Sequence, residues 1–196
     1  VKGGGVLPMI TSCSPGWVKF CERYYPELIP NLSTCKSPQQ MFGAVMKSYF
    51  AEKIGVKPEN MVSVSIMPCV AKKGEREMEL FHGEYAGHDV DIALTTRELT
   101  RLIRAAHIDP KSLEDVLADR PMGDYSGAGV IFGTTGGVME AALRTAYSVI
   151  KKENPPADAF KPVRSKAFQE NDGTIEATFK IDDIELNIAV VSGLGN

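Results

Sequence analysis

The sequence predicts an α/β fold, with a twisted, largely parallel sheet flanked by helices. Short apolar segments at residues 6–12, 62–67 and 89–95 are typical of buried strands. The second and third segments are each followed by a helix-compatible segment, and this strand–helix order indicates a parallel sheet. Hydrophobic residues make up 43% of the 196 residues. The chain can therefore bury the core of one large domain or of two small lobes.

The first third of the chain predicts one strand and two helices. The strand at 6–12 ends at Cys13, and the apolar spacing of residues 17–25 predicts the first helix. Residues 37–55 are strongly amphipathic. Ser37 is a suitable N-cap for this second helix, because Pro38 then occupies the first helical position, where its missing N–H costs nothing.

The stretch VSVSIMPCVAKKGE, residues 62–75, is the most informative part of the sequence, because it joins a predicted strand to a cysteine and a helix-compatible segment. Val62, Val64 and Ile66 alternate as in a buried strand, and Pro68 ends that strand because it lacks a backbone donor. A cysteine, Cys69, therefore follows at the strand end. In open α/β folds, ligands bind at the carboxyl ends of strands.

The second half of the chain continues with strand, helix and hairpin signals. Residues 89–95 form a strand, and Thr96 is a suitable N-cap for the next helix. The glycine-rich residues 126–137 lead into a helix over 138–152, and residues 151–162 are predicted to be a connector. Two alternating segments then predict a β-hairpin; they are residues 174–180 and 185–191, with the turn at Asp182 and Asp183.

Composition excludes several classes of protein. The net charge of −3 and the lack of a basic run argue against a nucleic-acid-binding surface. No apolar stretch approaches the roughly 20 residues that cross a bilayer, and there is no signal peptide, so we expect a cytoplasmic protein without a membrane segment. Because the chain starts at Val1 and stops at Asn196 directly after an apolar strand, we expect a piece of a longer polypeptide.

The four cysteines do not resemble a disulfide scaffold, and none forms a CxxC pair. Cys13 and Cys69 both follow predicted strands, so they can converge at one sheet edge, where thiolates suit iron-sulfur clusters, zinc or copper. The alternative is that each cysteine is a small buried apolar residue, and we adopt it for Cys21 and Cys35.

The glycine-rich segment has two interpretations. It can cradle a phosphate, although it matches neither a dinucleotide fingerprint nor a P-loop. A close backbone approach to another ligand, which requires residues without a Cβ atom, is the favoured interpretation. The three histidines, His82, His88 and His107, have no ligand spacing and are expected at the surface.

Two motifs carry a resemblance to a known family. TSCSPGW at 11–17 and MPCVAKKGE at 67–75 resemble the signatures TSCCPxW and MPCxxKxxE of the iron-only (FeFe) hydrogenases. The resemblance continues through KSPQQMFGA, TTREL and GDYSGAGVIFGTTGGVMEAALR, so it covers essentially the whole chain. It implies the catalytic domain of that family, which has two lobes, with one lobe and part of the second present over residues 1–196.

The resemblance also implies a cofactor, the H-cluster, in which a four-iron cubane is joined through a cysteine sulfur to a two-iron subsite carrying carbonyl, cyanide and a bridging dithiolate amine. Cys69 matches a cubane ligand, Met67 a methionine packed against the two-iron subsite, and Lys72 the lysine that hydrogen-bonds a cyanide. A buried ammonium offers a charge-assisted bond to an anionic acceptor and needs a counter-charge, which Glu75 can supply. The alternative for this pair is an exposed ion pair on a surface helix.

Other matches complete the implied site. Cys13 matches the cysteine that passes protons to the bridging amine, and Ser33 matches a serine further along that path. A thiol suits this role because its usual pKa of about 8.5 makes it exchangeable near neutral pH. The residues that match the lining of the two-iron pocket are Pro38, Gln39, Phe132 and Gly133.

The sequence departs from the family pattern in three ways. Ser14 stands at a cubane-ligand position, and serine is a poor ligand for iron in such a cluster. Either Cys13 ligates the cubane in its place or cluster binding is weakened. The third signature, ExMxCxGGCxxGGGQP, and the accessory iron-sulfur domains are not in residues 1–196. We therefore expect this piece to be inactive alone and to hold no complete cluster.

The resemblance implies that the parent protein reversibly reduces protons to hydrogen. Its implied partners are accessory iron-sulfur domains or subunits, ferredoxin or NAD(P)-linked electron-transfer subunits, and hydrogenase maturation proteins. The alternative is a sensory or iron-sulfur-assembly relative that binds a cluster without significant turnover, which the Cys13-Ser14 pair favours. Exposed apolar surface would also allow the fragment to oligomerise.

Overall fold

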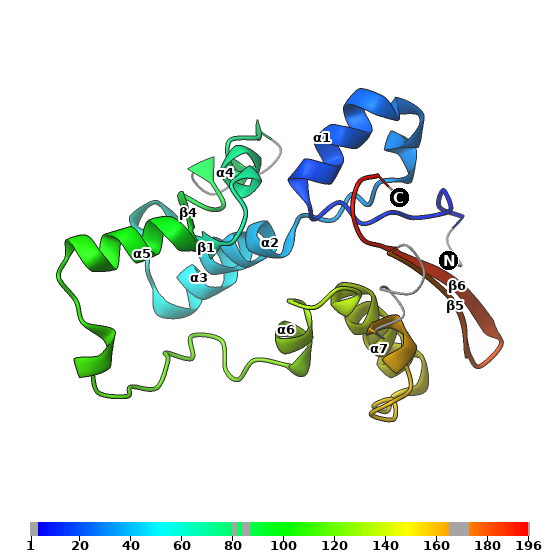
Figure 1. Ribbon diagram of the computed structural model, residues 1–196. Helices are drawn as coiled ribbons and strands as arrows, with labels where there is room; N and C mark the ends of the chain where they lie inside the picture. The colour runs from blue at the N-terminus through cyan, green and yellow to red at the C-terminus, as the bar shows by residue number, and fades with distance from the viewer. Residues whose placement is uncertain (1–3, 80–81, 84–86, 165–172, 196) are drawn as a thin grey trace. The chain divides into compact units, whose positions relative to one another are not determined.

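A computed structural model describes residues 4–79, 82–83, 87–164 and 173–195 of the chain (Figure 1). The chain forms two compact units, Val1–Met122 and Gly123–Asn196. The described residues mix helices with one parallel and two antiparallel strand pairs. None of the described helices has the length and hydrophobicity to cross a membrane.

The segment before Cys13 is not the strand that the sequence predicts. Among the residues that the structure describes, only Ile10 of this segment makes a strand-like contact, a single parallel bridge to Leu32. Val6, Leu7 and Met9 are between 56% and 68% exposed, so the segment has no buried face to hold it in a sheet. Cys13 therefore follows an extended segment, and helix α1, Pro15–Tyr24, begins two residues later. This helix confirms the prediction for residues 17–25.

The predicted helix over 37–55 is confirmed as one continuous helical stretch in three parts. Helix α2 spans Pro38–Val45, a π-helical turn spans Met46–Phe50, and α3 spans Ala51–Ile54. Gly55 ends the stretch in the left-handed conformation, with a φ of 66°, which glycine adopts without a steric penalty.

Strands β1, Val64–Met67, and β4, Ile92–Thr95, pair in parallel. Helix α4, Ala71–Arg76, follows β1, and helix α5, Thr96–Ala105, follows β4; both helices contact β4 (Figure 1). The predicted strand–helix order and the parallel pairing are therefore confirmed. The remaining short elements of this unit are η1 (Pro26–Asn31), η3 (Pro58–Asn60), β2 (His82–Gly83), β3 (Gly87–His88) and η5 (Pro110–Ser112).

The N-cap of α5 is Thr95, one residue earlier than predicted. The Thr95 hydroxyl accepts a hydrogen bond from the Glu98 backbone N–H, and the Glu98 carboxylate accepts one from the Thr95 backbone N–H. This reciprocal capping box satisfies two backbone donors at once. Thr96 lacks the glutamate three residues later that Thr95 has, which explains the shift by one position.

The two faces of β1 are reversed relative to the sequence prediction. Val62, Val64 and Ile66 are between 49% and 69% exposed, although their alternation predicts a buried face. The intervening Ser63 and Ser65 face the polar side chains of Asp91 and Gln39. Within the described residues, the serine face of the strand is thus the covered face, because its hydrogen bonds attach the strand to Asp91 and Gln39.

The second unit contains α6 (Gly127–Ile131), α7 (Gly137–Lys151), η6 (Lys161–Arg164) and the antiparallel strands β5 (Thr174–Ile181) and β6 (Ile184–Val191). The hairpin confirms the prediction, with its turn at Asp182 and Asp183. Leu143, Phe160, Val163 and Ile181 form the core of the unit. The segment predicted as a connector, 151–162, thus contributes Phe160 to that core.

The glycine-rich segment approaches protein backbone closely at its C-terminal end. A Cβ atom on Gly136 would lie 2.1 Å from the Val163 carbonyl oxygen, and one on Gly137 would lie 1.7 Å from the Ile131 carbonyl oxygen. These two glycines are therefore required for packing between α6, α7 and η6, whereas Gly127, Gly129 and Gly133 have open space around them.

Candidate active site

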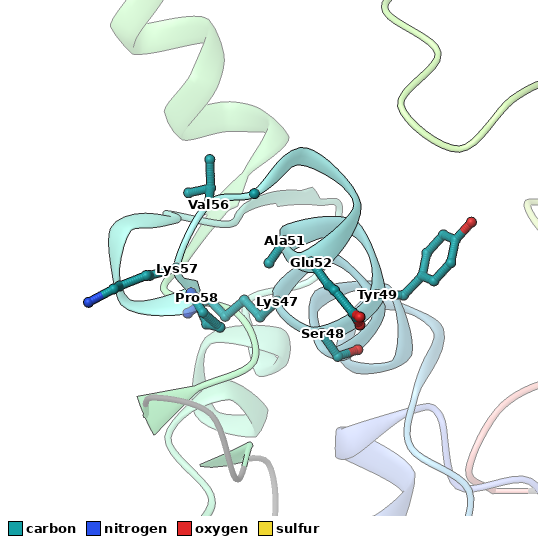
Figure 2. Close-up of a pocket in the computed structure, with 9 residues that line it drawn as sticks. Lys47, Ser48, Tyr49, Ala51, Glu52, Val56, Lys57 and Pro58 are labelled. Carbon is teal, nitrogen blue, oxygen red and sulfur yellow. The ribbon is translucent and has the colours of Figure 1, made fainter.

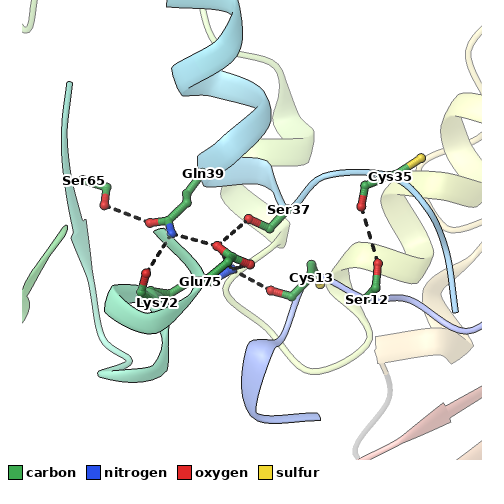
Figure 3. Close-up of polar contacts among 8 residues, drawn as sticks. All are labelled: Ser12, Cys13, Cys35, Ser37, Gln39, Ser65, Lys72 and Glu75. Carbon is green, nitrogen blue, oxygen red and sulfur yellow. Dashed lines mark hydrogen bonds and ion pairs between the residues drawn. The ribbon is translucent and has the colours of Figure 1, made fainter. Parts of the chain in front are cut away.

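The candidate site is built around the ion pair between Lys72 and Glu75, one turn apart on α4. Lys72 Nζ lies 3.0 Å from Glu75 Oε1 and 3.2 Å from Oε2 (Figure 3). The side chains are only 13% and 3% exposed, respectively. The alternative of an exposed ion pair on a surface helix is therefore wrong, and the attraction between the two charges compensates for their lost hydration.

Helix α2 supplies two further donors to the same carboxylate. Ser37 Oγ and Gln39 Nε2 lie 2.9 and 2.8 Å from Glu75 Oε2, and both side chains are buried. Ser37 does occupy the predicted N-cap position, but its hydroxyl donates to Glu75 instead of capping α2. Charge-assisted bonds of this kind fix a carboxylate in one place.

The extended segment before α1 reaches the site through its backbone. Lys72 Nζ donates to the Cys13 carbonyl oxygen at 2.6 Å. The structure therefore brings together four of the predicted site residues, which come from three separate segments: Cys13, Gln39, Lys72 and Glu75 (Figure 3). With the Glu75 carboxylate and the Cys13 carbonyl as neighbours, Lys72 is a positioned ammonium that can donate to an anionic ligand.

Ser33 lies in a second small network beside Cys13. Its hydroxyl accepts a hydrogen bond from the Cys35 backbone N–H at 3.2 Å, and its carbonyl oxygen accepts one from Ser12 Oγ at 2.6 Å. Ser12 also donates to the Cys35 carbonyl at 3.4 Å. Cys35 is exposed, so its assignment as a buried apolar residue is wrong, whereas Cys21 is fully buried as predicted.

Other predicted residues lie near the ends of elements without joining the Lys72–Glu75 network. Met67 is the last residue of β1, Cys69 is exposed two residues later, and Ser14 is the exposed N-cap residue of α1. Pro38 is exposed at the start of α2. Phe132, which is 39% exposed, and Gly133 belong to the second unit, where they follow α6.

Sequence reasoning missed the contributions of Ser37 and Ser65. Ser65 Oγ donates to Gln39 Oε1 at 2.8 Å and so links β1 to α2. The signal was the alternation of serines 63 and 65 with the apolar residues of this strand. A period of two places both serines on one face, and two polar residues on one face of a strand indicate a polar contact there.

A second ion pair attaches the helix over 38–54 to the segment before β4. Lys47, which is buried on the π-helical turn, lies 2.7 Å from Asp91 Oδ1 and donates to the His88 carbonyl at 2.6 Å. Burial raises the pKa of Asp91, but the bonds from Lys47 and Ser63 outweigh it, so the net pKa lies below its usual range. The Asp91 carboxylate therefore stays charged at neutral pH.

An open pocket with a cavity volume of about 580 Å³ lies beside this helix and the turn that follows it (Figure 2). It is lined by residues including Lys47, Glu52 and Lys57. None of the predicted site residues lines it, and the Lys47 ammonium is already engaged by Asp91 and His88. The pocket is therefore separate from the candidate active site.

The residues at the site fit the two-iron subsite of the implied cluster better than they fit the cubane. The Lys72 ammonium, with an anionic counter-charge beside it, suits the cyanide of the two-iron subsite. A cubane needs about four thiolate ligands. Within the described residues, no group of three or more His, Cys, Asp and Glu side chains could hold a metal ion. This part of the chain therefore offers Cys69 and Cys13 as single thiols, not a complete ligand set.

The family described as "Iron only hydrogenase large subunit, C-terminal domain" matches residues 1–196. The chain belongs to the iron-only hydrogenase family. The resemblance found in the motifs is thereby confirmed.

Individual relatives agree with this assignment. The chain is 48% identical over 190 residues to the NADP-reducing hydrogenase subunit HndD of Solidesulfovibrio fructosivorans, covering 97% of this chain and 32% of the relative. It is 44% identical over 196 residues to iron hydrogenase 1 of Clostridium pasteurianum, covering 100% of this chain and 33% of the relative. The chain thus spans about a third of the length of these hydrogenases.

Solved structures confirm the fold class. The chain matches the apo [FeFe]-hydrogenase HydA1 from Chlamydomonas reinhardtii with a TM-score of 0.72 and 40% identity, over 96% of this chain and 53% of that one. A more distant group of relatives is also present. The cytosolic Fe-S cluster assembly factor narfl of Xenopus tropicalis is 30% identical, over 89% of this chain and 39% of the relative.

Proposed function

We propose that this chain is part of the catalytic domain of an FeFe hydrogenase, an oxidoreductase that reversibly reduces protons to molecular hydrogen. The observation that carries the proposal is the buried Lys72–Glu75 pair, which closes on Gln39 and on the Cys13 carbonyl. The ammonium and the carboxylate are 13% and 3% exposed, and a buried ammonium with its counter-charge beside it suits a charge-assisted bond to an anionic ligand.

The proposed roles follow from the chemistry of each side chain. The H-cluster, when bound in the full protein, supplies the redox chemistry and the site where protons meet electrons. Lys72 would donate a hydrogen bond to a cyanide of the two-iron subsite, and Glu75 would neutralise the charge of Lys72. Cys69 would supply one thiolate to the cubane, and Met67 would help to hold the two-iron subsite. The proposed pocket-lining residues are Pro38, Gln39, Phe132 and Gly133.

Cys13 and Ser33 belong to the proposed proton path. Cys13 is a partly exposed residue with a free thiol, and the hydroxyl of Ser33 lies in the neighbouring network with Ser12 and Cys35. A thiol and a hydroxyl can both accept and release a proton. Their positions on segments that meet at the site support the proposal that Cys13 delivers protons to the reacting centre.

The partners of the full protein are part of the same proposal. Two relatives are named as subunits of larger hydrogenases, the NADP-reducing enzyme and a periplasmic enzyme. By analogy, we propose accessory iron-sulfur domains or subunits, ferredoxin or NAD(P)-linked electron-transfer subunits and maturation proteins as partners. A cytoplasmic location remains our proposal; the relative named as periplasmic comes from Nitratidesulfovibrio vulgaris.

The alternative is a relative that binds a cluster without significant turnover. Ser14 at a cubane-ligand position favours it. The assembly factor narfl is 30% identical to this chain, whereas two hydrogenases are 44% and 48% identical, which favours the hydrogenase. A sensory relative is proposed to bind a cluster without significant turnover, so a turnover measurement separates it from the hydrogenase.

Infrared spectroscopy of the full-length parent, matured with its assembly proteins, tests the proposal. A hydrogenase shows carbonyl and cyanide bands and evolves hydrogen from a reduced electron donor. The same bands without hydrogen evolution establish the sensory alternative. A matured protein without carbonyl or cyanide bands would overturn the hydrogenase proposal and leave the iron-sulfur-assembly relative.

Replacement of Ser14 by cysteine tests cubane ligation in the same parent. If Ser14 is the weak position, Ser14→Cys raises the iron content per protein, because a thiolate is the better ligand. Unchanged iron content assigns ligation to Cys13 instead. Cys35→Ser is the matched control, since Cys35 is exposed and has no proposed role in the cluster.

A further inference from the structure

Ser65 connects the central strand to the candidate site through a single hydrogen bond. It lies in the middle of β1, and its Oγ lies 2.8 Å from Gln39 Oε1 (Figure 3). Gln39 is only 5% exposed. Within the described part of the chain, Ser65 is the one donor to this amide oxygen.

The hydrogen-bond partners of Gln39 determine the positions of its amide nitrogen and its amide oxygen. Glu75 Oε2 and the Lys72 carbonyl oxygen lie 2.8 and 3.3 Å from one end, and both can only accept. The amide nitrogen must therefore face them, and the oxygen must face Ser65. Ser65 can then act only as a donor.

This arrangement makes a chain of contacts from β1 to the ammonium. Ser65 holds Gln39, Gln39 donates to Glu75, and Glu75 holds Lys72 at 3.0 Å. We propose that Ser65 is a positioning residue, which sets the place of the Lys72 ammonium through Gln39 and Glu75. The role of Lys72 in this inference rests on the proposed function. The chain of contacts from Ser65 to Lys72 does not depend on it.

Removal of the Ser65 hydroxyl has a defined consequence. The buried Gln39 oxygen loses its donor, and a buried polar group without a partner is unfavourable. The amide then moves toward another donor, and its bond to Glu75 lengthens. Glu75 keeps Ser37 and Lys72, so the site stays folded. Without the bond from Gln39, however, the carboxylate is free to turn, and the ammonium that it holds moves with it.

Ser63 provides a matched control two residues earlier. Its Oγ donates to the Asp89 carbonyl at 2.7 Å and lies 3.2 Å from Asp91 Oδ2, so it shares none of the contacts of the Lys72 network. Both serines are partly buried. Ser63→Ala therefore removes a comparable hydroxyl without touching the proposed chain of contacts, and Ser65→Thr keeps a hydroxyl at the test position.

The first test uses crystal structures of the full-length parent without its two-iron subsite. In Ser65→Ala, the Gln39 Nε2 to Glu75 Oε2 distance is expected to exceed about 3.5 Å, beyond a hydrogen bond. In Ser65→Thr and Ser63→Ala it remains as in the unmodified protein. An unchanged Gln39 and Lys72 in Ser65→Ala would overturn the inference.

The second test uses the matured parent. Ser65→Ala is expected to shift the cyanide infrared bands and to lower kcat about tenfold with an unchanged KM for the electron donor, as for a misplaced group. Ser65→Thr restores both, and Ser63→Ala lowers only the Tm. Equal shifts with both alanine variants would reduce Ser65 to a structural residue. If even the unmodified parent lacks these bands, the proposed function fails, while the crystal structures still decide the role of Ser65.

Discussion

Glu75 shows how one carboxylate organises residues that lie far apart in the sequence. It is 3% exposed and accepts hydrogen bonds from Ser37, Gln39 and Lys72. A buried carboxylate of this kind is stable only while its donors remain, because no water can replace them. The same bonds join α2 to α4, so this site residue also holds the fold together.

The first prediction concerns this carboxylate. Glu75→Gln removes the counter-charge of Lys72 and places an amide N–H₂ group against the donors Ser37 and Gln39. Breaking a buried ion pair in this way is expected to destabilise the chain by about 3 kcal/mol. Urea unfolding measures the loss. The control is Glu79→Gln, an exposed position just beyond α4, which is expected to change stability by less than about 0.5 kcal/mol. Equal stability of the two variants would contradict the prediction.

Gly43 determines how closely the helix over 38–54 approaches the segment before β4. A Cβ atom at this position would lie 2.4 Å from the Asp89 carbonyl oxygen and 2.9 Å from Val90 Cγ2. Both neighbours are buried, so neither can move aside easily. The small residue is therefore needed for the contacts that Lys36 and Lys47 make with Asp89 and Asp91.

The second prediction compares two helical glycines. Gly43→Ala is expected to destabilise the chain by about 1–3 kcal/mol, because it forces two packed segments apart. Gly16→Ala, in α1, has nothing within 4 Å of its new Cβ and is expected to stabilise by about 0.5–1 kcal/mol. Thermal unfolding of both variants checks the opposite signs. A stabilising Gly43→Ala would disprove the close approach.

The third prediction concerns the start of α5. A hydrogen bond from Lys73, together with bonds from Thr95, lowers the pKa of Glu98 from 4.5 to about 2. Because the folded pKa is the lower one, the stabilisation is fully present above pH 4.5 and is lost as the pH falls through about 2. The protection factors of the amides in the first turn of α5, taken relative to the intrinsic exchange rate at each pH, are therefore expected to fall over this range.

Two threonine variants separate the cap from its neighbour. Thr95→Ala removes the capping box and is expected to cost about 1 kcal/mol, whereas Thr96→Ala is expected to change stability by less than about 0.5 kcal/mol. The reverse order would show that Thr96 is the N-cap after all.

At the level of elements, periodicity predicted the helices, the parallel pair and the hairpin, because each depends on local patterns of apolar residues. It failed at residues 6–12, where Val6, Leu7 and Met9 are exposed and, among the described residues, only Ile10 makes a strand-like bridge. It also failed for the covered face of β1, because the Ser65–Gln39 bond joins residues 26 positions apart. Long-range polar contacts leave little trace in local periodicity.

For the site, the motifs predicted Cys13, Gln39, Lys72 and Glu75, and the structure brings these four together. Spacing within a helix explains the Lys72–Glu75 pair, which lies at i and i+3. Nothing in the spacing indicated that Lys72 would bind a backbone carbonyl 59 residues away, at Cys13. The catalytic and cluster-binding roles of these four residues, like those of Met67, Cys69, Phe132 and Gly133, stay predictions.

At the scale of the molecule, each unit has its own stabilising interactions, and the first unit leaves an apolar sheet face uncovered. Val64 pairs with Ile92, and Ile66 pairs with Leu94, so these side chains share one face. Three of them are at least 44% exposed. Neighbouring exposed apolar side chains of this kind favour association with other surfaces.

The fourth prediction is therefore self-association of the 196-residue chain when it is studied alone. Light scattering is expected to show species larger than a monomer, and Val64→Thr with Ile66→Thr is expected to reduce them. The control pair, Val116→Thr with Leu117→Thr, lies in an irregular segment at 87% and 83% exposure and leaves association unchanged. A monodisperse monomer would contradict the prediction.

The π-helical turn at Met46–Phe50 bears on how the length of this chain can vary. A π-helical bond spans five residues where an α-helical bond spans four, so the turn holds one more residue than a regular helix needs. Deletion of Tyr49, which is 57% exposed, is expected to convert the turn to α-helix while α2 and α3 keep their faces. A deletion inside α2, at Met41, shifts every later contact instead. The unfolding free energy is therefore expected to fall less on deletion of Tyr49 than on deletion of Met41. Such a result would show that the π-helical turn is a position where the helix can gain or lose a residue.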